Sequence, residues 1–237
     1  EIIRRLQEMG VKSDFIQIGD GVSRINVKLK SIDGTEINGA GPVIGKEKVE
    51  QLMEKLDTLE EGDVLFLAGS IPSSMPDDMY EQIMARLDGK GVMIVVDATK
   101  DLLVNVLKYH PFLVKPNNHE LGEIFGVELK TREDVIPYGK KLQEKGAVNV
   151  LISMAGDGAI LITEDGQNIK MGTPKGKVVN SVGAGDSMVA GFITGYIRGG
   201  NYEEALKSGT AAGSATAFSE GLASLEMYEK MLKQITE

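Results

Sequence analysis

Two runs, Val64-Leu-Phe-Leu-Ala68 and Val92-Met-Ile-Val-Val96, decide the fold class of this sequence. Two more runs of the same kind follow, Phe112-Leu-Val114 and Val148-Asn-Val-Leu-Ile152. Such short runs are apolar on both faces, which is typical of strands in a parallel sheet that helices cover on both sides. Between them, helices are predicted near 46–59, 77–88, 101–109 and 132–145, several closed by a glycine (Gly62, Gly91, Gly146). The alternation predicts an α/β fold with a doubly wound, mostly parallel sheet.

Both ends of the sequence favour helices. Ile2 to Met9 predicts a helix that Gly10 closes, and the chain after Gly183 is predicted to be mainly helical. No initiator methionine and no strand precede the first helix, so we expect that an N-terminal segment is missing from the sequence.

The composition of the chain argues against several classes of binding partner and site. The chain has 237 residues and a formal charge of -9, which argues against nucleic acid or an anionic membrane as the main partner. It has no cysteine, which excludes disulfides and thiolate zinc sites, and two histidines, His110 and His119, which we expect at the surface or in capping positions. No apolar run approaches the roughly 20 residues of a spanning helix, and no signal peptide is visible. A cytoplasmic location is expected.

A different pattern precedes the α/β region. Arg24-Ile-Asn-Val-Lys-Leu-Lys30 alternates, with Ile25, Val27 and Leu29 on one face. Asp33-Gly34 favours a tight turn, and Thr35 begins a return strand. The sequence therefore predicts a half-buried hairpin within about 14–41, which could be a lid, a dimer contact or the edge of the main sheet.

Polar residues follow all four predicted strands. The strands are followed by Gly69-Ser70-Ile-Pro72, by Asp97-Ala-Thr99, by Lys115-Pro-Asn117 with Glu120 beyond it, and by Ser153 with Ala155-Gly156-Asp157-Gly158. Ligands of open parallel sheets bind beyond the carboxyl ends of the strands. A ligand site is therefore predicted at this edge.

The sharpest local pattern is Val182-Gly-Ala-Gly-Asp186-Ser187 before a helix from Met188 to Tyr196. Glycines let the backbone approach an anion, and a helix start offers free N–H groups. A P-loop is excluded because no G-x-x-x-x-G-K-[ST] occurs, and the dinucleotide pattern fails because Met188 takes the place of its third glycine. Asp186 could be a helix N-cap or a first-turn carboxylate that only stabilises the helix, or it could accept a hydroxyl proton beside a bound phosphate.

Four other residues could have either a structural or a functional role. Lys115 could be a solvated strand end, and Glu120 a first-turn helix charge. Alternatively, Asn117 and Glu120 could share a face and orient water on Mg²⁺, which is usually held through waters and substrate phosphates. Arg24 could be a surface cation or could grip a substrate phosphate.

Together these motifs resemble the ribokinase-like, PfkB-type carbohydrate kinases over essentially the whole chain. Val182 to Ser187 is similar to the C-terminal signature of that family, and Asn117 to Glu120 to its N-x-x-E magnesium motif. The resemblance implies a single domain over 1–237, built as a three-layer αβα sandwich with a β-hairpin lid. The segments 24–30, 35–39, 68–72 and 180–191 resemble the 1-phosphofructokinase branch, which implies ATP-dependent phosphorylation of fructose 1-phosphate at C6.

The resemblance also implies roles for individual residues. Asp186 would be the base, and Gly183, Ala184 and Gly185 an anion hole. Arg24 and Ser70 would contact the sugar phosphate, and Asn117 and Glu120 would order Mg²⁺. ATP would lie against residues from four parts of the chain, namely Lys115, Ser153, Met154, Ala155, Gly156, Asp157, Gly158, Gly185, Ala212 and Gly213.

The sequence departs from the family pattern at two points. Asn180 stands where many members have Asp, which bears on binding of a monovalent cation. The first strand of the family and its glycine-rich sugar-binding segment have no counterpart here. Tagatose-6-phosphate kinase and a non-catalytic sugar-phosphate or nucleotide sensor are the alternatives, and the hairpin is a candidate homodimer contact.

Overall fold

The computed structural model describes residues 1–19, 21–28 and 36–235. Within them the chain divides into two compact units, Glu1–Leu59 with Ile71–Met79, and Glu60–Ser70 with Tyr80–Glu237. We call them unit 1 and unit 2 and describe each by itself. No helix in the described ranges is long and apolar enough to cross a membrane.

Unit 1 contains the predicted hairpin. Its elements are α1 (Ile2–Glu8), β1 (Asn26–Lys28), β2 (Glu36–Asn38) and α2 (Lys46–Leu56). The two strands pair antiparallel with Val27 opposite Ile37, which confirms a hairpin, although its strands are shorter than predicted. The apolar side chains of Ile25, Val27 and Ile37 are exposed and not half-buried. Leu29, Lys30, Asp33-Gly34 and Thr35 lie outside the described residues.

Unit 2 contains the central sheet, whose strand order is β3-β4-β5-β6-β7-β8. The first four strands pair in parallel, and β7 and β8 are antiparallel to their neighbours. The strands are β3 (Val64–Ala68), β4 (Met93–Asp97), β5 (Leu113–Val114), β6 (Asn149–Ser153), β7 (Ala159–Ile162) and β8 (Asn168–Met171). This sheet confirms the α/β class, with four predicted strands in place and two that the sequence analysis did not predict.

The helices of this unit are α3 (Met79–Leu87), α4 (Lys100–Val104), α5 (Asn118–Phe125), α6 (Arg132–Glu144), α7 (Ala184–Gly199), α8 (Tyr202–Ala217) and α9 (Leu225–Leu232). Two 3₁₀ turns occur at Leu107–Tyr109 and Ala155–Asp157. The single helix predicted over 101–109 is thus two short pieces. The α7 helix starts at Ala184, four residues before the predicted start, so Asp186 lies inside its first turn.

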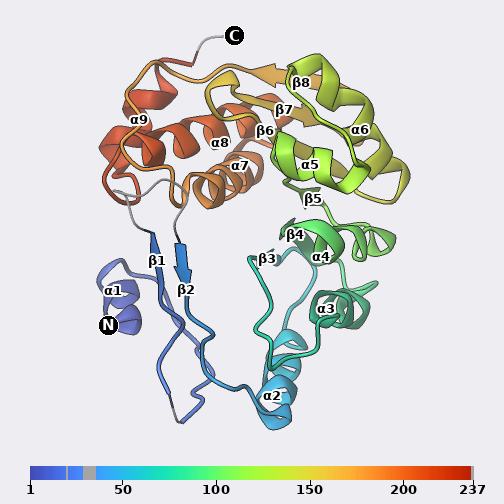
Figure 1. Ribbon diagram of the computed structural model, residues 1–237, viewed down its shortest axis with the longest axis vertical. Coiled ribbons are helices and arrows are strands. Elements are labelled where there is room, and N and C mark those ends of the chain that lie inside the picture. The colour runs from blue at the N-terminus through green and yellow to red at the C-terminus, as the bar shows by residue number, and fades with distance from the viewer. Residues whose placement is uncertain (20, 29–35, 236–237) are drawn as a thin grey trace. The chain divides into compact units, whose positions relative to one another are not determined.

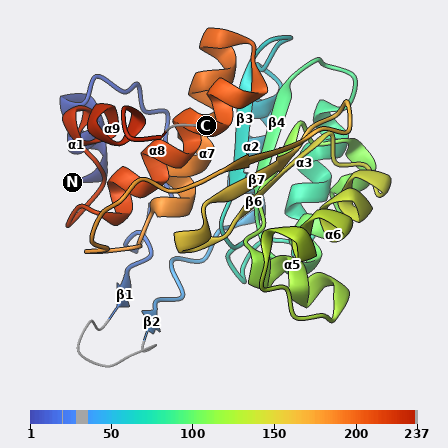
Figure 2. The same cartoon turned by 90° about the horizontal axis from the view of Figure 1, so that it is seen from above.

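Helices cover the sheet on both faces, as the apolar strands predicted. Figure 2 shows β6 and β7 between α7 and α8 on one side and α5 and α6 on the other. On the first side, Leu151 and Leu161 belong to the core that Phe192 of α7 and Leu206 of α8 complete. On the other, Gly139 of α6 lies against Ile162. Unit 2 is therefore a three-layer αβα sandwich.

The α7 and α8 helices run side by side in close contact (Figure 1). A Cβ at Gly191 would lie 2.7 Å from the Cβ of Ala212, and one at Gly213 would lie 3.0 Å from the carbonyl oxygen of Ala184. Glycines at these crossing points let the backbones approach. The start of α7 is thereby held by direct backbone packing against α8.

Candidate active site

The polar strand ends meet at one edge of the sheet. Ala68 is in register with Asp97, the last residue of β4. Asn117 forms a parallel bridge with Ser153, the last residue of β6. The predicted convergence of the ends of β3 to β6 is thus present in unit 2.

A buried ion pair occupies this edge. Lys115 Nζ lies 3.1 Å from Asp97 Oδ1, and the side chains are 7% and 18% exposed. Burial raises the pKa of Asp97, Lys115 opposes the rise, and the charges of Asp186 and Glu120 add to it. Lys115 is therefore no solvated strand end. It is a buried cation paired with Asp97, a carboxylate on which the charges of Asp186 and Glu120 also act.

The first turn of α7 carries two free backbone donors. Gly183 is the N-cap residue in the left-handed conformation (φ 79°, ψ 0°), which glycine adopts without steric cost. The N–H of Ala184 donates to the Ser181 carbonyl, but within the described ranges the N–H groups of Gly185 and Asp186 have no acceptor. Unpaired donors at a helix start bind anions.

Lys115 extends this cationic surface. A Cβ at Gly185 would lie 3.2 Å from Lys115 Nζ and 3.6 Å from its Cε, so the lysine side chain packs directly on the glycine Cα. The ammonium group and the two free amides therefore lie at the same helix start. Such a set of donors suits a phosphate group.

The Asp186 carboxylate has no structural partner. It is exposed, it caps no N–H, and in the described part of the chain it makes no hydrogen bond or ion pair. The N-cap interpretation is therefore wrong, because Gly183 holds that position, whereas Asp186 is a carboxylate of the first turn, which was the other structural interpretation. An unpaired carboxylate next to two free amides is available to accept a proton.

Asn117 and Glu120 form a capping box at the start of α5. Asn117 Oδ1 accepts from the Glu120 N–H, and Glu120 Oε2 accepts from the Asn117 N–H, both at 2.8 Å. Glu120 Oε1 keeps no donor among the described residues. The described chain has no group of three or more acidic or histidine residues arranged for a metal. This donor set fits Mg²⁺ that is held mainly through waters and phosphates.

The loop after β6 is a fixed turn. Met154 N–H donates to the Gly158 carbonyl at 2.8 Å, and Arg132 Nε donates to the Asp157 carbonyl at 2.7 Å. Met154 and Gly158 are buried, whereas Ala155, Gly156 and Asp157 are exposed. Of the six predicted nucleotide-contacting residues in this loop, these three are the most accessible to a ligand, and Ser153 is partly exposed.

The other predicted site residues have different surroundings. Gly213 is buried against α7, and Ala212 is partly exposed on α8. Ser70 is exposed after β3 in unit 2. Arg24 belongs to unit 1, where its Nε donates to Asn26 Oδ1 at 2.9 Å. The roles of these four residues remain predictions.

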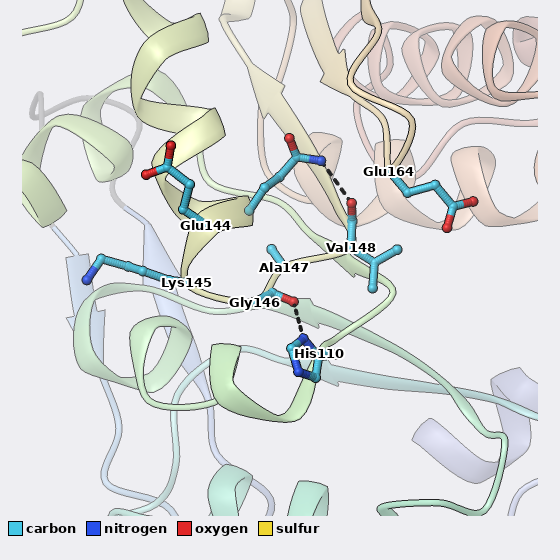
Figure 3. A pocket seen from close by; sticks show the side chains of 8 residues that line it. His110, Glu144, Lys145, Gly146, Ala147, Val148 and Glu164 are labelled. Carbon is cyan, nitrogen blue, oxygen red and sulfur yellow. Dashed lines mark hydrogen bonds between the residues drawn. The ribbon is translucent and has the colours of Figure 1, made fainter.

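A separate pocket lies near the amino end of β6. It has a volume of about 460 Å³ and is lined by His110, Gln143 to Val148 and Glu164 (Figure 3). His110 ends a 3₁₀ turn in the left-handed conformation, and its Nδ1 lies 3.0 Å from the Gly146 carbonyl oxygen. His110 therefore has the capping role expected from the sequence. The pocket is at the opposite edge from the strand ends described above.

Two residues have contacts that were not predicted from the sequence. Asp97 was predicted only as a strand end, although a carboxylate directly after the apolar run of β4 was a visible signal. Asn180 holds the loop before α7, because its Oδ1 accepts from the Val182 N–H at 3.2 Å and its Nδ2 donates to the Glu220 carbonyl at 2.9 Å. No sequence pattern indicates the second contact.

Comparison with known proteins decides the family. The model of the pfkB family carbohydrate kinases matches residues 1–227. The chain belongs to the pfkB family. Among related pfkB proteins, the 1-phosphofructokinase of Bacillus subtilis is 47% identical over 97% of this chain and 75% of the relative. The D-tagatose-1-phosphate kinase of Bacillus licheniformis is 36% identical over 95% of this chain and 74% of the relative.

Solved structures agree with this membership. A candidate phosphofructokinase from Staphylococcus aureus is 44% identical and superimposes with a TM-score of 0.88, covering 99% of this chain and 76% of that chain. Phosphofructokinase-2 of Escherichia coli, solved with potassium, is 26% identical with a TM-score of 0.86, covering 98% and 77%. The ribokinase-like fold of this pfkB member is thereby shown.

Proposed function

We propose that this pfkB-family kinase transfers the terminal phosphoryl group of ATP to the C6 hydroxyl of fructose 1-phosphate, giving fructose 1,6-bisphosphate. The relatives named 1-phosphofructokinase support this reaction. The observation that carries the mechanism is the first turn of α7, where the unpaired Asp186 carboxylate adjoins two N–H groups without acceptors.

In this mechanism Asp186 accepts the proton of the attacking hydroxyl. The amides of Gly185 and Asp186 donate hydrogen bonds to the transferring phosphoryl group, and Gly183 sets the backbone that aims them. Lys115 neutralises phosphate charge from the same side, since its Nζ packs on Gly185. Positioning and charge stabilisation provide most of the catalysis of phosphoryl transfer, so these few groups can suffice.

Nucleotide and metal would be held by neighbouring segments. Ala155, Gly156 and Asp157 are exposed in a turn that Arg132 and Thr173 fix by hydrogen bonds to its carbonyls, which suits contact with the nucleotide. Asn117 and Glu120 would hold Mg²⁺ through water, because Glu120 Oε1 is left over from the capping box. The metal would supply positive charge to the phosphates.

A second candidate acceptor is D-tagatose 1-phosphate, which the 36% identical relative favours. It differs from fructose 1-phosphate in the configuration at C4 and offers the same C6 hydroxyl. We also propose Arg24 and Ser70 as contacts of the substrate phosphate, since a guanidinium group binds phosphate oxygens in a bidentate manner.

Purified protein tests the function directly in an ADP-release assay. The values of kcat/KM would be compared for fructose 1-phosphate, tagatose 1-phosphate, fructose 6-phosphate and tagatose 6-phosphate. We expect the highest value for fructose 1-phosphate. A higher kcat/KM for another sugar phosphate would identify that sugar phosphate as the substrate instead. Nucleotide binding without turnover of any of the four would favour a non-catalytic sensor.

We further propose that two copies associate through the hairpin of unit 1. Ile25 is 67% exposed and Ile37 59% exposed, and Val27 pairs with Ile37 on the same face. A second copy could bury this apolar face. Sedimentation velocity of the protein and of Ile37→Lys tests the idea: the protein should be a dimer and the variant a monomer, whereas identical sedimentation contradicts it.

A further inference from the structure

The Asp97–Lys115 ion pair holds the lysine ammonium group in one place. Lys115 Nζ makes its ion pair with Asp97 Oδ1 at 3.1 Å, and among the described residues it makes no other hydrogen bond or ion pair. The backbone of Asp97 is fixed too, because its carbonyl accepts from the Gly69 N–H at 3.0 Å within the sheet edge. The lysine therefore has one rigid anchor.

The other side of the ammonium faces α7. Lys115 Nζ lies where a Cβ of Gly185 would come within 3.2 Å, so a single side chain links the end of β4 to the helix start. A lysine side chain has four rotatable bonds and readily changes conformation. Without the carboxylate of Asp97, nothing else described in the structure would keep the ammonium group at the free amides.

Stability alone is a poor explanation for this pair. Burying two charges is costly, and apolar residues of similar size often replace such pairs without loss of stability. The charges of Asp186 and Glu120 raise the pKa of Asp97 further, so they oppose the ionised form of this carboxylate. A role in the reaction accounts for its place.

We propose that Asp97 is a positioning residue that holds the Lys115 ammonium group against the first turn of α7, where the transferring phosphoryl group is bound. Asp97 acts only through Lys115 and does not touch the reacting atoms. The inference rests on the proposed phosphoryl transfer. It goes beyond that proposal by assigning a role to Asp97, which has no part in the proton transfer and metal binding proposed above.

A double-mutant cycle separates this role from a direct one. The proteins are the parent, Asp97→Ala, Lys115→Met and the double variant, each measured for kcat, for the KM of both substrates and for the Kd of a non-hydrolysable ATP analogue. A displacement of about 1 Å in a catalytic group costs on the order of 10² in rate, so we expect kcat of Asp97→Ala to fall about 10- to 100-fold. The double variant should be no slower than Lys115→Met within about threefold.

Two further variants control for folding and chemistry. Asp97→Asn keeps an oxygen that can accept from Lys115, so it should recover most of the activity lost in Asp97→Ala. If Asp97→Ala does not fold, Asp97→Val takes its place in the cycle, because it also removes the carboxylate but leaves less empty space in the partly buried site. Glu81→Ala removes the 2.7 Å ion pair with Lys108 on the surface of the same unit and should leave kcat unchanged.

The outcomes distinguish the two levels of the proposal. Multiplicative losses of the two single variants would overturn the positioning role, since Asp97 would then act independently of Lys115. A parent protein that binds the ATP analogue but turns over no sugar would overturn the proposed function. In that case the Kd values of the same four proteins decide the positioning role, which fails if the losses in affinity multiply.

Discussion

Gly183→Ala is the substitution whose effect on the anion site follows most directly from the backbone. Gly183 has φ 79°, and an L-residue pays about 1–2 kcal/mol to adopt this left-handed conformation. The added Cβ would lie 3.0 Å from Leu222 Cδ2, but Leu222 is 72% exposed and can move. We therefore expect the unfolding free energy to fall by about 1–2 kcal/mol, with the protein still folded.

Turnover should fall much further than stability. The strain can be relieved by rotating the peptide that precedes α7, which turns the N–H groups of Gly185 and Asp186 away from the phosphate. Loss of one such donor typically costs about 10²–10³ in kcat, so we expect a decrease of about 10². Steady-state ADP release at saturating substrates measures kcat, and urea unfolding measures stability.

Gly166→Ala is the matched control. Gly166 has φ 83° in the turn between β7 and β8, and its Cβ would meet nothing within 4 Å. This turn follows β7, which is antiparallel to β6, so it lies at the edge opposite to Ser153. The control should lose similar stability and no kcat. Equal kcat for both variants would refute the claim that Gly183 aims the anion-binding amides.

Two other predictions concern stability. Burial raises the pKa of Asp97 above its ordinary value near 3.8, so the native state binds this proton more tightly than the unfolded chain. The stability that Asp97 contributes is therefore fully present below about pH 3.8 and is lost as the pH rises through the raised native pKa. The difference in unfolding free energy between the parent and Asp97→Asn should fall over this range and be level above it. A difference in urea unfolding that does not depend on pH would contradict this. Gly139→Ala would bring a Cβ within 2.3 Å of Ile162 Cδ1 in the core, so urea unfolding should show a loss of about 1–3 kcal/mol, with unchanged kcat; no loss of stability would mean that α6 can move away from the sheet.

The strands of the parallel sheet could be predicted because burial on both faces makes each of them a continuous apolar run. The observed bounds of β3 are those predicted, and β4, β5 and β6 begin or end within one residue of the predicted bounds. The β7–β8 hairpin was missed. Its strands have only four residues each, and β8 alternates between exposed Asn168 and Lys170 and more buried neighbours. Asp165-Gly166 between them was a turn signal that could have indicated it.

The site could be predicted in part for a similar reason. The glycine-flanked Asp186 is a local pattern, and its place at the start of a helix follows from the residues around it. The partner of Lys115 could not be predicted in this way. The contact with Asp97 depends on the pairing of β4 with β5, which no local motif indicates. Likewise, Asn117 and Glu120 fit both the N-x-x-E magnesium motif and the capping box of a helix start, so the sequence alone could not separate the two roles.

The central claim is that the carboxylate of Asp186 takes the proton of the attacking hydroxyl beside the free amides of α7. Asp186→Asn tests it most directly, because the carboxylate has no hydrogen bond or ion pair among the described residues whose loss would disturb the fold. With fructose 1-phosphate and ATP, we predict that kcat falls by at least about 10² while the Kd of ATP and the unfolding free energy stay nearly unchanged. Turnover equal to that of the parent protein would contradict the account.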